Sequence, residues 1–253
     1  MSIDIFIYLS LFALAIGSFV GVFIYRFPLM ESNETLDLIN PRSFCPSCKR
    51  QLKIQMIIPL FSFLFLRGRC GYCQKKIEPL YIINELIHLF VMLLILSSYE
   101  SFNISMVFIF LLFSIFYTQI ILDYRHLILS VTLSILLILA GVTINYYLNY
   151  FTSLEESILG MAVGYISLWL IKALYFLIRK KIGIGSGDFL LFSGCGAIFG
   201  VYALGPILLI GSSISTFIYV LNKKKFAEQI PLGSGIASGA VIYYLIFVVI
   251  ELL

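Results

Sequence analysis

The sequence predicts an all-α membrane protein: a polytopic bundle of about eight transmembrane helices with one small cytoplasmic domain. Three observations lead there. Of 253 residues, 61% are hydrophobic and only 12% are charged, whereas soluble domains have about 45–50% apolar and about 25% charged residues. The mean hydropathy is +1.04. Finally, the apolar residues gather into segments long enough to cross a bilayer, which takes about 20 helical residues per crossing.

Eight apolar segments are separated by short polar loops. They cover residues 3–25, 81–98, 103–121, 127–147, 156–178, 188–201, 203–221 and 235–252. The first segment has no basic residue before it, and its first positive residue, Arg26, follows it. A secretory signal begins with a positively charged region. We therefore expect this segment to be a retained anchor.

The distribution of Lys and Arg predicts the orientation. Cationic side chains favour the cytoplasmic side of a membrane. The loops after the first, third, fifth and seventh segments carry Lys or Arg, whereas Tyr99–Phe102, Asn149–Glu156 and Tyr202–Gly205 carry none. This pattern places both termini outside. The net charge of +4 is then a topology signal and does not indicate nucleic-acid binding.

Three parts follow along the chain. Residues 1–25 form the first transmembrane helix, 26–80 a cytoplasmic domain, and 81–253 the remaining transmembrane bundle. Residues 26–80 make the only loop long enough to fold by itself, and they hold four of the five cysteines. The fifth, Cys195, lies inside an apolar segment and is expected to be a buried small side chain.

The four loop cysteines form two C-x-x-C pairs, Cys45 with Cys48 and Cys70 with Cys73. Two such pairs can supply four thiolates to one tetrahedral zinc ion. Two disulfides are the alternative, but disulfides are rare in the reducing cytoplasm where this loop is placed. The spacing therefore predicts a Zn²⁺ ion, and four thiolates leave no open position, so the metal is structural.

Acidic residues inside apolar segments predict chemistry, because a carboxylate in a bilayer is costly and rarely persists without a purpose. Asp123 ends the third segment and Asp188 begins the sixth, both on the inside. Two nearby carboxylates share a proton and can activate water for attack on a peptide bond. The glycines at 183–187 leave room for an extended substrate beside Asp188.

Other interpretations of these acids remain open. Either Asp could cap its helix or pair with Arg125 or Lys181. A membrane transporter could use the two acids to relay protons or bind a cation. A third acid, Glu85, lies with Asn84 and His88 at the start of the second segment, where these side chains could pair with the basic loop or line a pocket beside it.

The motifs together resemble the type IV prepilin peptidases, which belong to the GxGD intramembrane aspartyl proteases. Gly17–Pro28 is similar to the family's opening motif, the cysteine pairs to its zinc domain, and Gly185–Asp188 to its G-x-G-D. Ile230–Gly235 resembles a later segment, with Ser234 where Pro is usual. Departures are Gly21 for Asn, no I-P-D after Asp123, and Leu190 for Lys.

The resemblance implies an enzyme of the bacterial inner membrane, multi-pass, with periplasmic termini and a cytoplasmic zinc domain. It would cleave the leader peptide of type IV prepilins or pseudopilins with Asp123 and Asp188. It would also methylate the new N-terminus from S-adenosylmethionine, with Gly68 and Glu85 as candidate residues for the methyl donor. An assembly factor that holds prepilins without cutting them is a further alternative.

Overall fold

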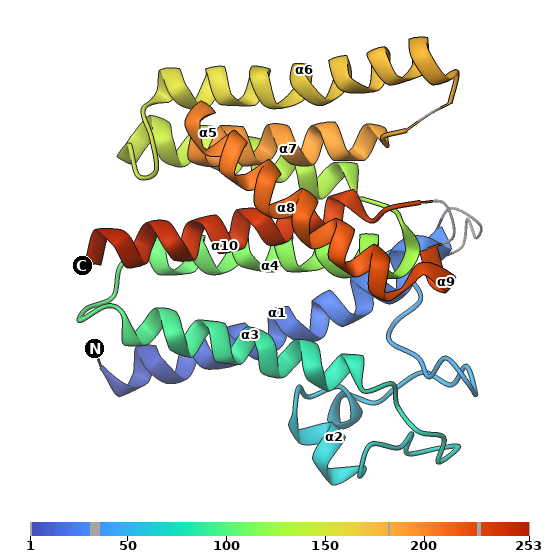
Figure 1. The fold of residues 1–253 in the computed structure, drawn as a ribbon. Coiled ribbons are helices and arrows are strands. Elements are labelled where there is room, and N and C mark those ends of the chain that lie inside the picture. The colour runs from blue at the N-terminus through green and yellow to red at the C-terminus, as the bar shows by residue number, and fades with distance from the viewer. Residues whose placement is uncertain (1, 31–35, 182, 227–228, 253) are drawn as a thin grey trace. The chain divides into compact units, whose positions relative to one another are not determined.

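The computed structural model describes residues 2–30, 36–181, 183–226 and 229–252 (Figure 1). Within these ranges the regular elements are helices, and β pairing is limited to two isolated bridges. The chain divides into two compact units, Met1–Ser114 and Ile115–Leu253. The prediction of an all-α protein is confirmed.

Every predicted apolar segment coincides with a helix. The first unit contains α1 (Ile3–Met30), η1 (Ile54–Met56), α2 (Phe61–Phe65) and α3 (Leu80–Ser97), and α4 (Ile104–His126) runs from the first unit into the second. The second unit continues with α5 (Val131–Leu148), α6 (Leu154–Arg179), α7 (Ser186–Phe199), α8 (Val201–Leu221), α9 (Lys223–Phe226) and α10 (Leu232–Leu252). Among the described residues, six helices are long and apolar enough to span a membrane; α7 and the stretch Leu232–Ile246 are shorter. A multi-pass membrane protein follows, and eight spans is an approximate count.

The predicted boundary between the third and fourth segments is displaced. Helix α4 continues to His126, and α5 begins only at Val131. Leu127 stops α4 with a positive φ of 55°, and the hydroxyl of Ser130 caps α5 by accepting the backbone N–H of Leu133 at 3.4 Å. The residues between these points are apolar, so hydropathy alone assigned them to a helix. As a result, Asp123 lies inside the last turn of α4.

In the first unit, α1 and α3 run side by side (Figure 1). Gly17 lets their backbones approach, because a Cβ at this position would lie 2.8 Å from the carbonyl oxygen of Asn84. Near the other ends of the two helices, Ala13, Met92 and Phe110 form a fully buried cluster. The close crossing at Gly17 fixes the first turns of α3, where Glu85 lies.

In the second unit, α7 is the central helix. It packs against α5, α6, α8 and α10, and most of its side chains are buried. A Cβ on Gly160 of α6 or Gly196 of α7 would overlap the backbone of the other helix. Gly200 ends α7 with a φ of 81°, a conformation that glycine adopts without strain. Asp188, in the first turn of α7, is therefore held inside the unit.

Candidate active site

The two aspartates predicted to act together lie in the same unit. Asp123 is 6% exposed and Asp188 is 8% exposed. They come from the end of α4 and the start of α7. Asp123 contacts Ser234, and Leu129 packs against Gly233 and Gly187, the residues directly before Ser234 and Asp188. The described part of the chain thus places two buried carboxyl groups at helix ends that share a neighbouring side chain.

Each carboxyl group accepts hydrogen bonds from the start of a helix. The Oδ2 atom of Asp123 accepts the backbone N–H of Ser234 at 2.5 Å and its hydroxyl at 2.9 Å. Ser234 lies in the first turn of α10. The Oδ2 atom of Asp188 accepts the backbone N–H of Gly185 at 3.1 Å. Helix N-termini stabilise negative charge, so both carboxyl groups have partners for their ionised forms.

The loop between α4 and α5 is held one turn from Asp123. Gln119 is fully buried; its side chain donates to the carbonyl of Ser130 and accepts the backbone N–H of Ser130, both at 2.9 Å. This pair of bonds fixes the chain that follows Asp123. Sequence reasoning missed Gln119, although a glutamine inside an apolar helix is a signal that a partner is present.

The glycines around the aspartates have different roles. A Cβ on Gly187 would lie 3.0 Å from Leu129, and one on Gly233 would lie 2.7 Å from the same side chain. Both glycines therefore allow Leu129 to pack between α7 and α10. A Cβ on Gly185 would instead lie 3.2 Å from the carboxylate of Asp188. Of these three, Gly185 is the one that keeps the space beside an aspartate open.

In the first unit, the four cysteines of the two pairs come together. The Sγ atoms of Cys45, Cys48, Cys70 and Cys73 lie within 4.8 Å of one another, and those of Cys45 and Cys73 are 3.9 Å apart. Thiolates bound tetrahedrally to zinc at about 2.3 Å are separated by about 3.8 Å. The cluster therefore fits a metal site of the predicted kind.

The two cysteine pairs are built alike. In the first, the backbone N–H of Lys49 donates to the carbonyl of Cys45 at 2.8 Å; in the second, that of Gln74 donates to Cys70 at 3.0 Å. Lys49 and Gln74 both have positive φ, 57° and 56°. Each turn thus directs two sulfur atoms to the same point, and this similarity between the pairs was not anticipated from the sequence.

The thiols affect one another's ionisation. Burial disfavours the thiolate of Cys45, but hydrogen bonds from the backbone N–H groups of Cys48 and Ser47, together with those from the neighbouring thiols, lower its pKa to about 7. At Cys73 the backbone N–H of Lys75 lowers the pKa, but burial and the neighbouring thiols raise it to about 11. Four thiolates this close require a cation to neutralise their charge, which is the role of a bound metal ion.

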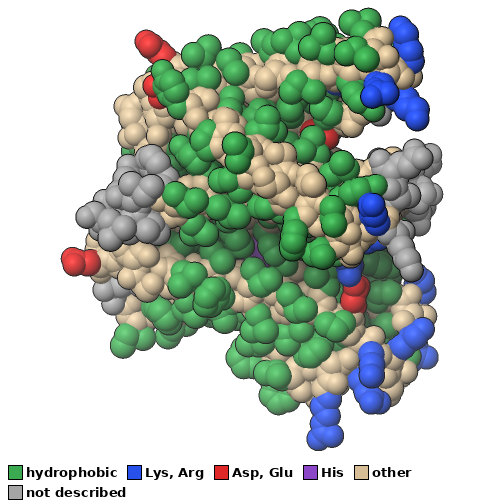
Figure 2. Space-filling view, viewed as in Figure 1, with side chains coloured by type: hydrophobic (Ala, Val, Ile, Leu, Met, Phe, Trp, Pro, Cys, Tyr) green, Lys and Arg blue, Asp and Glu red, His purple; other side chains and the backbone are tan. Residues whose placement is uncertain are grey.

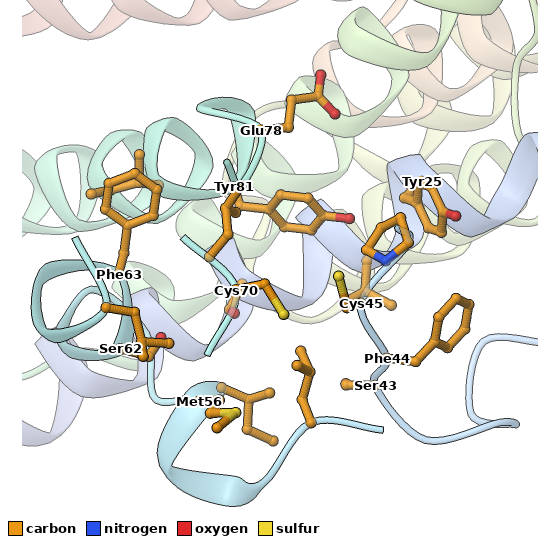
Figure 3. A pocket seen from close by; sticks show the side chains of 18 of the residues that line it. Tyr25, Ser43, Phe44, Cys45, Met56, Ser62, Phe63, Cys70, Glu78 and Tyr81 are labelled. Carbon is orange, nitrogen blue, oxygen red and sulfur yellow. The ribbon is translucent and has the colours of Figure 1, made fainter. Parts of the chain in front are cut away.

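A cavity of about 350 Å³ lies beside the cysteine cluster (Figure 3). Aromatic side chains form part of its wall: Tyr25, Phe44, Phe63 and Tyr81. Charged side chains form another part: Arg26, Lys75, Lys76, Glu78 and Glu85. Cys45 and Cys70 also line it, so the cavity and the cysteine cluster share a wall. The wall thus combines aromatic side chains with charges of both signs.

The residues at the start of α3 separate into two groups. Glu85 lines the cavity, and its carboxylate accepts the backbone N–H of Leu60 at 2.7 Å. Asn84 and His88 are fully buried. The ring of His88 hydrogen-bonds the carbonyl of Asn84 at 2.7 Å and the hydroxyl of Ser114 at 3.1 Å. The sequence left two alternatives open, pairing with the basic loop or lining a pocket beside it. Glu85 lines a pocket.

Gly68 has a local structural task. It adopts a φ of 66°, and its N–H donates to the carbonyl of Phe63 at 2.8 Å, which closes α2. It is not among the residues that line the cavity. Its role as a methyl-donor residue stays a prediction.

Arg26 ties the cavity to the loop that follows α1. Its side chain is only 3% exposed and donates to the carbonyls of Asp37 at 2.8 Å and Pro41 at 2.7 Å. Its guanidinium also lies 5.6 Å from the centre of the Phe44 ring. The resemblance marked Arg26 as part of an opening motif, and these contacts give the position a physical reason.

Two family models match consecutive parts of the chain. The bacterial peptidase A24 N-terminal domain matches residues 11–99, which include the cysteine cluster and the cavity wall. The type IV leader peptidase family matches residues 106–221, which include Asp123 and Asp188. No solved structure matches the chain.

Curated relatives match over most of their length. A protein of Legionella pneumophila named prepilin leader peptidase/N-methyltransferase is 35% identical over 252 residues, covering 90% of this chain and 87% of the relative. A protein of that name from Klebsiella pneumoniae is 35% identical, covering 81% and 90%. One from Neisseria gonorrhoeae is 31% identical, covering 92% and 88%. The chain therefore belongs to the prepilin leader peptidase/N-methyltransferase family.

Proposed function

We propose that this protein is an aspartyl endopeptidase that removes the leader peptide of type IV prepilins or pseudopilins and then methylates the new N-terminus. The observation that carries the proposal is that Asp123 and Asp188 are both buried and both lie at helix ends of the second unit. The family name of the relatives supports both activities. Nothing in those names favours the transporter alternative.

The two aspartates divide the chemistry of hydrolysis. The ionised one takes a proton from a water molecule that attacks the scissile carbonyl, and the protonated one donates to the carbonyl oxygen. The two donors of Ser234 stabilise negative charge on Asp123, which suits Asp123 to receive the proton of the water. Asp123, which now carries the proton of the water, then gives this proton to the leaving amine as the C–N bond breaks. Asp188 recovers its own proton from a hydroxyl of the tetrahedral intermediate as the carbonyl forms again, so the pair returns to its starting state.

The membrane position of the aspartates suits this substrate class. We place the termini in the periplasm and residues 26–80 in the cytoplasm, since Lys and Arg gather in the loops on that side. Both aspartates then lie at the cytoplasmic edge of their helices. A prepilin has a short basic leader before a hydrophobic helix, so its junction stands at that edge while the helix lies in the bilayer.

The cavity of the first unit is our proposed site for S-adenosylmethionine, which supplies the methyl group. Aromatic rings such as Tyr81 and Phe44 would hold its adenine and face its sulfonium, and the exposed Lys75 or Lys76 of the wall would pair with its carboxylate. The carboxylate of Glu85 would bind a cationic group, either of the methyl donor or at the N-terminus of the substrate. These assignments rest on the types of side chain that line the cavity.

Zinc is the metal we propose for the cysteine cluster, with a structural role. A small domain gains stability when a metal joins distant parts of the chain. Because Cys45 and Cys70 line the cavity, a metal at the cluster would also hold the cavity wall. The activity expected to depend on the metal is therefore methylation.

The test of the peptidase is substitution of either aspartate in purified protein. Asp123→Asn and Asp188→Asn keep the side-chain size and remove the acid, so each should abolish cleavage of a prepilin while the protein still inserts into membranes. Asp4→Asn, at an exposed position in the first turn of α1, is the matched control. If both variants cleave prepilin at the rate of the unaltered protein, the proposed mechanism is wrong.

A further inference from the structure

A patch of exposed apolar side chains lies on the first unit, outside its long helices. It comprises Ile54, Ile58, Phe61, Leu64 and Phe65, here named the α2 patch. Phe65 is 84% exposed and Leu64 is 61% exposed. Soluble surfaces rarely leave large apolar side chains contiguous and open to water, so the α2 patch calls for a partner.

The other side of the same segment is already used. Met56, Ser62, Phe63 and Leu66 line the cavity, and Figure 3 shows the first three among the side chains around it. Helix α2 therefore turns one face to the cavity and presents Phe61, Leu64 and Phe65 on the other. The exposed face is free for contact with something outside the unit.

Helix α2 is tethered to a membrane-spanning helix. The backbone N–H of Leu60, directly before α2, donates to the carboxylate of Glu85 in α3. Leu60 adopts a positive φ of 63° to make this turn. At the other end, the bond from Gly68 to Phe63 closes α2. The start of the segment is thus attached to α3, and the bond at its other end closes the short helix.

The length of α3 sets the depth of that attachment. α3 has 18 residues, which at about 1.5 Å per residue give about 27 Å, slightly less than the roughly 30 Å of a hydrocarbon core. To cross the bilayer, α3 must use its whole length, including the turn that holds Glu85. In Figure 1, α2 lies level with the first turns of α3 along the direction of that helix. With α3 crossing the bilayer over its whole length, the α2 patch comes level with the edge of the hydrocarbon core.

The charge around the α2 patch complements an anionic lipid surface. Between Asp37 and Glu78 the sequence has eight Lys or Arg residues and no Asp or Glu. Lys53 precedes the patch, Arg67 and Arg69 follow it, and all three are exposed. Figure 2 shows hydrophobic and cationic side chains next to each other on the part of the first unit that holds α2. Apolar side chains flanked by cations are typical of segments that lie in a membrane interface.

We propose that the α2 patch is an interfacial membrane anchor: Phe61, Leu64 and Phe65 insert at the boundary between the headgroups and the acyl chains of an anionic bilayer and hold the cysteine domain on the membrane surface. The inference rests on α1 and α3 spanning the membrane and does not depend on the proposed enzyme activity. Because α2 also forms a wall of the cavity, this anchor would hold the cavity open at the lipid surface. A substrate whose hydrophobic helix stays in the bilayer could then reach the cavity with its N-terminus.

Tryptophan fluorescence in lipid vesicles tests this anchor. The chain has one tryptophan, Trp169 in α6. In a Trp169→Phe background, Phe65→Trp reports on the α2 patch, and Tyr72→Trp, on the turn of the second cysteine pair, is the matched control. Vesicles contain phosphatidylcholine and phosphatidylglycerol with brominated acyl chains, which quench tryptophan in contact with them. The unaltered chain, through half-exposed Trp169 of a membrane-span helix, verifies reconstitution.

The expected result is a blue-shifted Phe65→Trp emission that loses most of its intensity in brominated vesicles, whereas Tyr72→Trp keeps most of its intensity. Replacing phosphatidylglycerol by phosphatidylcholine should weaken the quenching at Phe65→Trp. If Phe65→Trp emits as in water and escapes quenching while Trp169 is quenched, the proposal is overturned, and the α2 patch serves another partner such as a protein. Circular dichroism of each variant establishes that the helices are intact, and prepilin cleavage is not part of this readout.

Discussion

Ser234 holds Asp123 through two donors on one oxygen, its backbone N–H at 2.5 Å and its hydroxyl at 2.9 Å. The hydroxyl also lies 3.2 Å from the carbonyl of Ile120, one turn before Asp123. N–H groups in the first turn of a helix have no partner within that helix. The start of α10 can therefore bind the aspartate without weakening its own helix, and it joins α10 to the end of α4.

Ser234→Ala should slow cleavage. The variant keeps the N–H and loses the hydroxyl donor, and a hydrogen bond to a charged group contributes about 1.5–3 kcal/mol, so kcat should fall about tenfold or more. The KM for prepilin should change little, because Ser234 contacts the aspartate and is not proposed to contact substrate. Cleavage kinetics with a purified prepilin measure both constants.

Two further variants show whether the hydroxyl is responsible. Ser234→Thr retains a hydroxyl and should restore kcat toward that of the unaltered protein. Ser238→Ala removes a partly buried serine hydroxyl one turn further along α10 and should leave kcat unchanged. An unaltered kcat in Ser234→Ala would mean that the hydroxyl does not help to position Asp123 for catalysis.

Gly196→Ala should destabilise the second unit. A Cβ at this position would overlap the backbone of Gly160 in α6, and overpacking of this kind costs about 1–3 kcal/mol. Gly205→Ala is the matched control, since a Cβ on Gly205 in α8 has no neighbour within 4 Å and alanine favours a helix by up to about 1 kcal/mol. Thermal unfolding in detergent should show a lower midpoint for Gly196→Ala alone. Equal midpoints would mean that α6 and α7 are less closely packed than described.

Hydropathy predicted the helices because a membrane segment must be apolar along most of its length. The same signal failed at Leu127, where apolar residues continue through a loop that a positive φ creates. It also gave no indication of the α2 patch, since apolar residues in a loop do not reveal which face they expose. Local sequence could not predict these features, because each depends on backbone conformation or on a partner distant in the chain.

The sequence predicts those parts of the site in which a motif has a fixed spacing. The cysteine pairs met as expected, because two C-x-x-C turns direct their sulfur atoms alike. The contact of Ser234 with Asp123 joins residues more than a hundred positions apart, and no spacing rule links them. The packing of Leu129 against Gly187 and Gly233 could not be predicted either, because no spacing rule links these residues.

Removing one metal ligand should impair methylation more than cleavage. Cys73→Ser should lower the zinc content of purified protein from one ion per chain, because the remaining three thiolates bind more weakly. Loss of the metal should loosen the cavity wall, which includes Cys45 and Cys70, whereas the aspartates belong to the other unit. Elemental analysis measures zinc, and mass spectrometry of the processed prepilin separates methylation from cleavage.

A control for that experiment is Cys195→Ala, which removes the cysteine buried in α7. It should keep the zinc content and the methylation of the unaltered protein. Unchanged zinc content in Cys73→Ser would rule out the four-cysteine site, and zinc loss with full methylation would show that the metal does not support the cavity.

Glu85→Gln should separate the two tasks of this side chain. The amide oxygen of glutamine can still accept the N–H of Leu60, which the carboxylate now accepts at 2.7 Å, so α2 should stay in place. The negative charge in the cavity wall is lost, and binding of a cationic methyl donor should weaken because its charge partner is gone. Methylation should therefore show a raised KM for S-adenosylmethionine.

Glu85→Ala removes the acceptor as well, so α2 should also detach from α3. The fluorescence of Phe65→Trp should report that change. If Glu85→Gln and the unaltered protein have equal KM values while Glu85→Ala releases α2, Glu85 serves only to anchor the segment and the cavity wall needs no negative charge at this position.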